Sequence, residues 1–179
     1  MTGTSPGAPA RGRVELRPTR LDDPVAARLV DELQADLTVR YGAPDPVGTG
    51  PEEFWPPRGV FLVAWLDGQP VGCAGLKEVD TGIAELKRMY VAPSARGHGV
   101  ARALLAGLED HARRAGVSRL RLITGEAQPE AVALYASAGW ERGAPYGPAI
   151  EYGWEEAIVF ERVLAVVPAP LEPAPEPSR

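Results

Sequence analysis

Cysteine and histidine are scarce in this sequence, with one Cys and two His among 179 residues. The single thiol, Cys73, excludes an internal disulfide, and one Cys with two His gives no credible metal cluster. No apolar run approaches the roughly 20 residues needed to cross a bilayer. The first residues also lack the charged start and apolar stretch of a secretory signal. These absences predict a metal-free protein, without membrane attachment, that works in the cytoplasm.

An excess of positive charge is missing too, because the formal net charge is −5 at pH 7. A nucleic-acid-binding protein would usually be strongly basic, so we expect no nucleic-acid partner. Apolar content is 45% and charged content 24%, as in globular proteins. A chain of 179 residues is long enough for one domain with a real core. Any site for an anion must therefore be local.

The two ends of the chain contain little that a core could bury. Residues 1–12 are rich in Gly, Pro, Ser, Thr and Ala, and residues 166–179 alternate proline with other residues. Alternating proline removes backbone donors and favours an extended conformation. We expect a disordered N-terminus over 1–12, one folded domain over 13–165 and a disordered Pro-rich tail over 166–179. A ligand for a proline-reading partner is the alternative for the tail.

The hydrophobic pattern between the ends predicts alternating strands and helices. A helix starts at a cap formed by Asp22 or Asp23, and an apolar stripe on a second helix leaves Glu109 and Arg113 facing outward. The strand after that helix should lie parallel to the strand before it, by a right-handed crossover. Expected strands cover residues 14–18, 59–66, 70–79, 83–91, 119–124, 140–142 and 157–163, and expected helices cover about 24–40, 98–115 and 129–139. The sequence therefore predicts an α/β fold, in which a mixed sheet carries helices on both faces.

The most informative segment runs from Glu85 to Arg102, where a strand leads through a short loop into a glycine-containing turn that opens a helix. Backbone N–H groups at a helix N-terminus lack internal partners and carry partial positive charge. Gly97 and Gly99 remove side chains that would keep a phosphate away from these donors. Arg88, Arg96 and Arg102 could add full charges. The segment therefore predicts an anion cradle.

The six residues Arg96-Gly97-His98-Gly99-Val100-Ala101 follow the pattern Gln/Arg-x-x-Gly-x-Gly/Ala. The segment thereby resembles the acyl-CoA-binding motif of the GNAT family of N-acetyltransferases. A second element, Leu134-Tyr135-x-x-x-Gly139-Trp140, is similar to a further motif of that family. The resemblance covers about residues 14–164. It implies the GNAT acyl-CoA N-acyltransferase fold, a central, mostly antiparallel mixed sheet flanked by helices.

The resemblance also implies an activity: transfer of an acetyl or other acyl group from acetyl-CoA to a primary amine of a small molecule or peptide. The amine would attack directly within a ternary complex, and a homodimer is compatible with the family. The turn would hold the pyrophosphate, while the pantetheine arm would lie between two parting strands. Met89 or Tyr90 could donate an N–H to the thioester carbonyl. The implied cofactor-binding residues are Met89, Tyr90, Val91, Arg96, Gly97, His98, Gly99, Val100, Ala101, Arg102 and Gln128, of which Gln128 replaces the usual Asn.

Two residues match positions with catalytic roles in the family. Glu85 could remove a proton from the amine, directly or through water, because an amine resembling lysine is mostly protonated at neutral pH. The alternative is an exposed strand residue alternating with Lys87. Tyr135 could donate a proton to the departing thiolate. The alternative for Tyr135 is packing, since it lies on the apolar face of its helix. His98 could approach a phosphate or lie in the turn without a role.

Other interpretations stay open at this point. The chain could keep the acyl-CoA fold as an inactive sensor or interaction module. It could instead bind a nucleotide through another phosphate loop, although Gly-Lys-Ser/Thr and Gly-x-Gly-x-x-Gly are missing. The acceptor is not identified by the sequence. Four aromatic residues in loops could line the acceptor pocket or cap the core: Tyr41, Trp55, Tyr146 and Trp154. Three acidic residues could attract a cationic acceptor: Glu52, Glu53 and Glu151.

Overall fold

The structure is a computed structural model that describes residues 12–46 and 48–165. The disorder expected over 1–12 and 166–179 therefore lies outside the described residues, apart from Gly12. The helices and strands follow in the order β1 (Val14–Pro18), α1 (Pro24–Tyr41), η1 (Pro51–Phe54), β2 (Gly59–Leu66), β3 (Gln69–Asp80), β4 (Ile83–Val91), η2 (Pro93–Ala95), α2 (Val100–Arg114), β5 (Arg119–Gly125), α3 (Pro129–Ser137), β6 (Glu141–Arg142), α4 (Pro148–Glu151) and β7 (Ala157–Val163). Within the described ranges, no helix is both long and apolar enough to span a bilayer.

Seven strands form one sheet in the order β1-β2-β3-β4-β5-β7-β6. Among the described strands, β4 and β5 make the one parallel pair, and every other neighbouring pair is antiparallel. The parallel pair is connected through α2, as the crossover rule predicts. The expected mixed, mostly antiparallel sheet is confirmed, and β6 and β7 pair antiparallel as expected.

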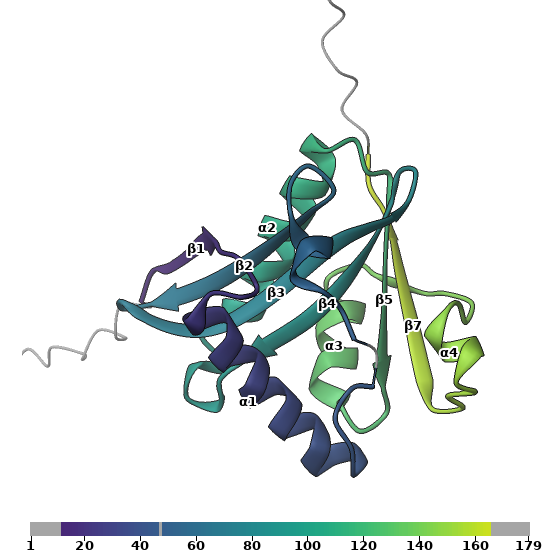
Figure 1. Cartoon of the computed structure of the whole chain (residues 1–179), viewed down its shortest axis with the longest axis horizontal. Helices are drawn as coiled ribbons and strands as arrows, with labels where there is room; N and C mark the ends of the chain where they lie inside the picture. Colours follow the sequence, from purple (N-terminus) through teal and green to yellow (C-terminus); the bar gives the residue numbers. More distant parts are fainter. Residues whose placement is uncertain (1–11, 47, 166–179) are drawn as a thin grey trace, which may run out of the picture.

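Helices cover both faces of the sheet (Figure 1). Side chains alternate along β2, so that Val60 and Leu62 pack in the core shared with α2, whereas Phe61 and Val63 pack in the core shared with α1. Helix α3 belongs to the α2 face, because Tyr135 lies in the same core cluster as Leu104. The sheet thus separates an α2 and α3 side from an α1 side.

Local sequence signals explain where the helices begin. Asp23 caps α1 by accepting a hydrogen bond from the Val25 N–H at 2.8 Å, and Pro24 fills the first helical position. Gly42, with a φ of 77°, ends the helix in the left-handed conformation. The choice left open between Asp22 and Asp23 is therefore resolved in favour of Asp23.

One prediction for α2 was wrong. Glu109 was expected to face outward, but only 8% of it is exposed. Its carboxylate lies 3.0 Å from Nε of Arg162 on β7 and 3.1 Å from Nη2 of Arg113. The two arginines compensate the cost of burying this negative charge. Arg162 lies on a distant strand, so its contact with Glu109 cannot be predicted from the helical pattern.

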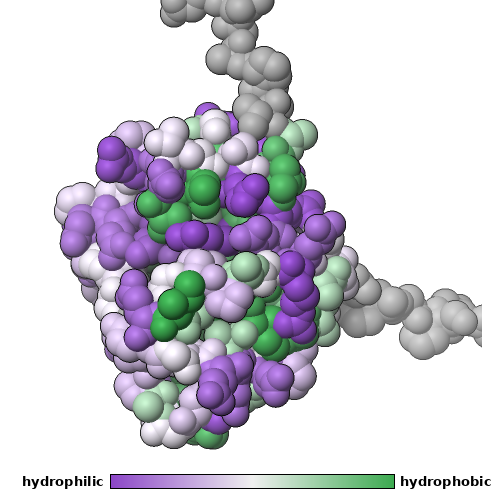
Figure 2. Space-filling view, turned by 90° about the vertical axis from the view of Figure 1, so that its right-hand side faces the viewer, coloured by the Kyte–Doolittle hydropathy of each residue, from purple (hydrophilic) through white to green (hydrophobic). Residues whose placement is uncertain are grey.

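The side of the molecule with β7 and α4 carries several exposed apolar side chains. Ile150, Tyr152 and Val163 are exposed, and the rings of Tyr152 and Trp154 stack with centroids 5.5 Å apart. Figure 2 shows this side, on which hydrophobic patches are broken up by hydrophilic residues. The short helix α4 was not predicted from the sequence, because four residues are too few to show a period.

Candidate active site

The central feature of the site is the separation of β4 from β5. The two strands pair only from Ile83 to Glu85 on β4 and from Arg119 to Arg121 on β5. Beyond these residues β4 continues to Val91 and β5 to Gly125 without pairing to each other. Figure 1 shows the two strands side by side at one end and diverging toward the other. Backbone groups on the facing edges therefore lack a strand partner, as expected.

A bulge bends β4 where it leaves β5. Arg88 has a φ of +58°, and the register with β3 shifts between Cys73 and Gly75. The Cys73 thiol donates to the Arg88 carbonyl at 3.4 Å. A bulge increases the local twist of a strand, which helps β4 turn away from its neighbour. This bulge could not be predicted from the sequence, because the left-handed residue is not a glycine.

The position of Arg88 corrects one expectation. Its side chain is only 8% exposed, and Nη1 lies 3.0 Å from Oδ2 of Asp45 in the loop after α1. Its charge is thus directed toward that loop and not toward the glycine turn. Arg96 and Arg102, by contrast, are exposed beside the turn. Arg102 Nη2 donates to Ser137 Oγ at 3.0 Å and so connects α2 with α3.

The glycine turn has the free donors that an anion requires. Gly97 and Gly99 have φ values of 79° and 81°, and Gly99 is the N-cap of α2. Within the described ranges, no backbone acceptor is present for the N–H groups of five residues: Gly97, Gly99, Val100, Ala101 and Arg102. A Cβ added at Gly97 or Gly99 would meet no atom within 4 Å. The turn therefore offers both donors and open space, and it fits the pyrophosphate of coenzyme A.

Gln128 lies at the N-cap of α3, close to the end of β5. Its Nε2 donates to the Tyr41 hydroxyl at 3.2 Å, and that hydroxyl also lies against Gly125. The C-terminal end of α1 thus reaches the open end of β5. The contact from Gln128 to the cofactor stays a prediction, and its amide oxygen is the atom left for it.

Tyr135 packs in the core, as one of its two interpretations required, and its role as an acid stays a prediction. It is 4% exposed and packs against Trp140 and Phe160, with ring centroids 5.8 and 5.6 Å away. Burial raises the pKa of the Tyr135 hydroxyl well above its ordinary value. This hydroxyl makes no hydrogen bond within the described part of the chain, yet it is not among the fully enclosed polar atoms. It therefore keeps some access to solvent and holds its proton at neutral pH.

Glu85 is not the exposed strand residue that the alternative interpretation required. Only 4% of it is exposed, and Lys87 beside it is also largely covered. The Tyr146 hydroxyl donates to Glu85 Oε1 at 3.1 Å, and Lys87 Nζ lies 3.5 Å from the same oxygen. Burial, together with the negative charge of Glu85, raises the pKa of Tyr146. The guanidinium of Arg121 lies over the Tyr146 ring, 3.8 Å from its centroid.

Three of the remaining loop aromatics and acidic residues have partners other than Glu85. Trp55 packs under Arg20, whose guanidinium lies 4.4 Å from the ring centroid. Trp154 stacks on Tyr152, and Glu53 pairs with Lys77 at 2.5 Å. Among the four aromatics expected in loops, Tyr146 is the one whose contact with Glu85 is established. The sequence singled out Tyr146 as a loop aromatic that could wall the acceptor pocket, but it contains no motif that would have identified Arg121.

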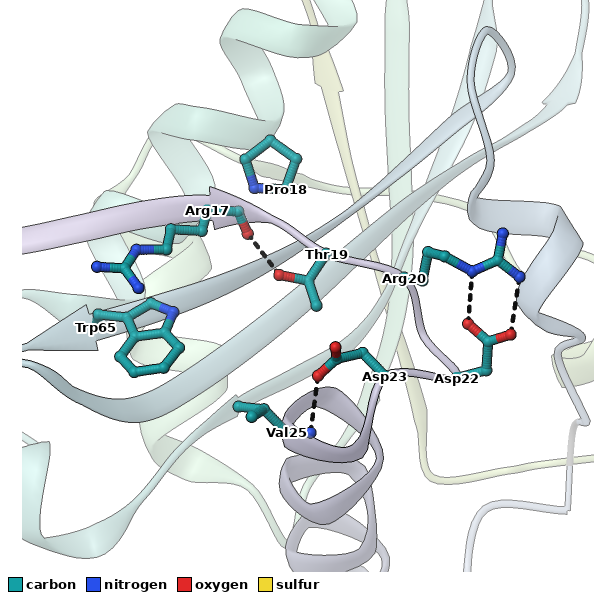
Figure 3. A pocket seen from close by; sticks show the side chains of 8 residues that line it. All are labelled: Arg17, Pro18, Thr19, Arg20, Asp22, Asp23, Val25 and Trp65. Carbon is teal, nitrogen blue, oxygen red and sulfur yellow. Dashed lines mark hydrogen bonds and ion pairs between the residues drawn. The ribbon is translucent and has the colours of Figure 1, made fainter.

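One cavity in the described part of the chain does not belong to this site. It measures about 630 Å³ and lies between the end of β1 and the start of α1, as Figure 3 shows. Its charged residues are already paired: Arg20 with Asp22 at 2.8 Å, and Asp23 with the Val25 N–H. A second hollow of about 370 Å³ lies between β6 and β7. The candidate site is thus defined by the parted strands and the turn, not by a cavity.

Comparison with known proteins decides the family. The family model described as "Acetyltransferase (GNAT) family" matches residues 28–140. The chain belongs to the GNAT acetyltransferases. Its relatives include a protein of Azospirillum brasilense named IAA acetyltransferase, which is 38% identical over 145 residues, covering 80% of this chain and 92% of the relative. The resemblance inferred from Arg96–Ala101 is therefore confirmed, and the protein is an acyltransferase of the N-acetyltransferase type.

Solved structures confirm the fold. A candidate acyl-CoA N-acyltransferase from Klebsiella pneumoniae superimposes with a TM-score of 0.68 at 28% identity, over 85% of this chain and 98% of that one. The PaiA N-acetyltransferase from Thermoplasma acidophilum, solved in complex with coenzyme A, superimposes with a TM-score of 0.63 at 17% identity, over 85% and 99% of the two chains. The GNAT family uses acetyl-CoA as acyl donor. The roles of individual residues stay predictions.

Proposed function

We propose that this GNAT acetyltransferase moves an acetyl group from acetyl-CoA to a primary amine of a small molecule or peptide, by direct attack within a ternary complex. One observation carries the proposal: the free donors of Gly97 and of Gly99 to Arg102 lie shortly after the end of β4 that has parted from β5. A diphosphate on the turn would extend its amide-containing arm into that opening. The relatives and neighbours named as acetyltransferases support this assignment.

The cofactor would be held mainly by backbone groups. The turn donates N–H groups to the pyrophosphate, and Arg96 and Arg102 add charge at its exposed side. The free edge of β4 at Met89 and Val91 would pair with the amides of the pantetheine arm. Bound there, acetyl-CoA supplies the thioester that is to be cleaved. The N–H of Met89 or Tyr90 would polarise its carbonyl.

The acid and the base are assigned from burial and position. An alkylamine must lose a proton before it can attack, and we assign this task to Glu85, directly or through one water molecule. Tyr146 and Lys87 fix the Glu85 carboxylate by their contacts at 3.1 and 3.5 Å. We assign proton donation to the departing thiolate to Tyr135, whose raised pKa keeps the hydroxyl protonated at neutral pH.

Two measurements test the proposal. Calorimetry should show that coenzyme A binds, whereas ATP and NAD do not. An assay for free thiol, run with acetyl-CoA and a broad panel of amines, should then show turnover. Binding of coenzyme A without thiol release from any amine would favour the inactive sensor. Binding of ATP without coenzyme A would end the assignment.

A further inference from the structure

A row of charged residues crosses the sheet on the face that carries Glu85. Strand register places Glu85 beside Lys77 on β3 and beside Arg121 on β5, and Arg121 lies opposite Glu161 on β7. Residues in register share a face of the sheet. The neighbours Ala84 and Leu86 belong to the α2 core, so the row lies on the opposite face, the α1 side. It borders the opening between β4 and β5.

Most charges in this row are already paired. Lys77 pairs with Glu53 at 2.5 Å, Lys87 with Glu85 at 3.5 Å, and Arg119 with Glu161 at 3.8 Å. The row and its pairing partners comprise four cations, Lys77, Lys87, Arg119 and Arg121, and three carboxylates, Glu53, Glu85 and Glu161. Glu141 on β6, opposite Glu161 in register, adds a fourth carboxylate at the edge of the sheet, so the charges balance in number. Within the described part of the chain, Arg121 is nevertheless the cation of this row that makes no ion pair.

Arg121 has donors that nothing in the described part of the chain accepts. Its Nε is enclosed and lacks a hydrogen-bond partner. The contact found for its guanidinium is the face of the Tyr146 ring, at 3.8 Å, which leaves the edge of the guanidinium free. Covering a charged group without pairing it is costly, so such a group calls for an explanation. A carboxylate with two oxygens matches the guanidinium fork and would pair this charge.

We propose that the acceptor amine itself carries a carboxylate, which Arg121 binds while the amine faces Glu85. This inference rests on the proposed acetyl transfer and specifies its substrate class. Tyr146 contacts both groups, with its hydroxyl on Glu85 and its ring under Arg121. The Glu85 carboxylate and the Arg121 guanidinium are thus separated by the length of one tyrosine side chain. That spacing suits a small amino acid, in which a few bonds separate amine and carboxylate, better than a protein lysine.

The first test needs only the protein as it exists. Thiol release from acetyl-CoA is measured with matched pairs of acceptors, each an amino acid and its own carboxamide. We expect kcat/KM for the acid to exceed that for the amide by about 10-fold or more, as for a charge-assisted hydrogen bond. The amide is the less protonated amine at neutral pH, so amine reactivity alone would give the opposite order. Equal or faster reaction of the amides would overturn the proposal.

The second test uses Arg121→Gln with Arg119→Gln as matched control. Both residues lie on β5, and Arg119 is half exposed and paired with Glu161. Arg121→Gln should raise KM for the acid by about 10- to 100-fold and leave the amide within about twofold. Arg119→Gln should preserve the preference, and Arg121→Lys should restore part of it. A preference for the acid that survives in a folded Arg121→Gln protein would also overturn the proposal.

Failure of this inference can be told apart from failure of the acetyltransferase assignment. Coenzyme A binding with thiol release from amines that lack a carboxylate, but not from amino acids, would leave the activity intact and refute the substrate class. If no amine at all led to thiol release, both the substrate class and the proposed acetyl transfer would be refuted. If a melting curve shows that the Arg121→Gln protein does not fold, the comparison of amino acids with their carboxamides in the unchanged protein decides whether the proposal holds.

Discussion

Replacement of Gly99 by Asp probes whether the glycine turn holds a diphosphate. The N–H groups around Gly99 have no backbone acceptor within the described ranges, and a Cβ at this position would point into open space. The new side chain would therefore clash with nothing in the protein itself. It would place a carboxylate where the phosphates are proposed to lie.

The magnitude follows from charge and backbone geometry. Two like charges about 5 Å apart in water repel by about 0.8 kcal/mol, so two phosphate charges give about 1.6 kcal/mol, or about a 15-fold rise in the Kd of coenzyme A. The left-handed φ of 81° at Gly99 adds about 1–2 kcal/mol of strain to the folded protein. For a domain of this size, that strain lowers Tm by only about 2–8 °C. The variant should remain folded at 25 °C.

Calorimetry at low and high salt provides the assay, with two controls. Gly99→Ala has the same backbone strain without the charge, so the charged part of the defect is the difference between the two variants. That difference should shrink as salt screens it. Gly116→Asp adds the same residue beyond the other end of α2, at a φ of 75° and again in open space, and should leave the Kd unchanged. A Gly99→Asp protein that binds coenzyme A at low salt within about twofold of the original affinity would place the phosphates elsewhere.

Three further predictions concern single side chains. Tyr135→Phe should lower kcat with little change in acetyl-CoA affinity, and an unchanged kcat would remove Tyr135 from the mechanism. Because the pKa of Tyr135 is raised, the hydroxyl should keep its proton between pH 7 and about pH 10. Over this range the rate should therefore not fall through ionisation of Tyr135. Glu85→Gln should lower kcat with little change in acetyl-CoA affinity, whereas an unaltered kcat would assign proton removal to water or another group. Burial raises the pKa of the Cys73 thiol to about 12, so a thiol reagent at pH 8 should label it only after unfolding, and labelling of the native protein would contradict this burial.

Local patterns were sufficient to predict most of the fold. The apolar spacing of residues 98–115, the cap at Asp22 or Asp23, and the turn at Gly97 and Gly99 each act over a few residues, so they can be read from the chain. The same holds for the parting of β4 and β5, which followed from the family motif at Arg96–Ala101. These features agree with one another, and the family and fold were confirmed.

Contacts between distant segments were not predictable in the same way. The carboxylate of Glu109 is buried because Arg162, on β7, reaches it. Arg88 turns to Asp45 through a bulge that no glycine marks. Tyr146 lies in a loop rich in Gly and Pro, and only the folded chain brings it to Glu85 and Arg121. In each case the partner is set by register and packing, on which a one-dimensional pattern carries no information.

The arrangement of Glu85 and Tyr135 has a consequence for how the reaction must proceed. Tyr135 belongs to the core on the α2 side of the sheet, whereas Glu85 lies on the α1 side. Under the proposed mechanism the base serves the attacking amine and the acid serves the departing sulfur, which lie on different sides of the thioester carbonyl. An intact sheet would keep these two groups apart. The opening beyond Glu85, where β4 has left β5, is the place where both could reach the same carbonyl. Under these assignments, the parted strands would serve the chemistry as well as the binding of the cofactor.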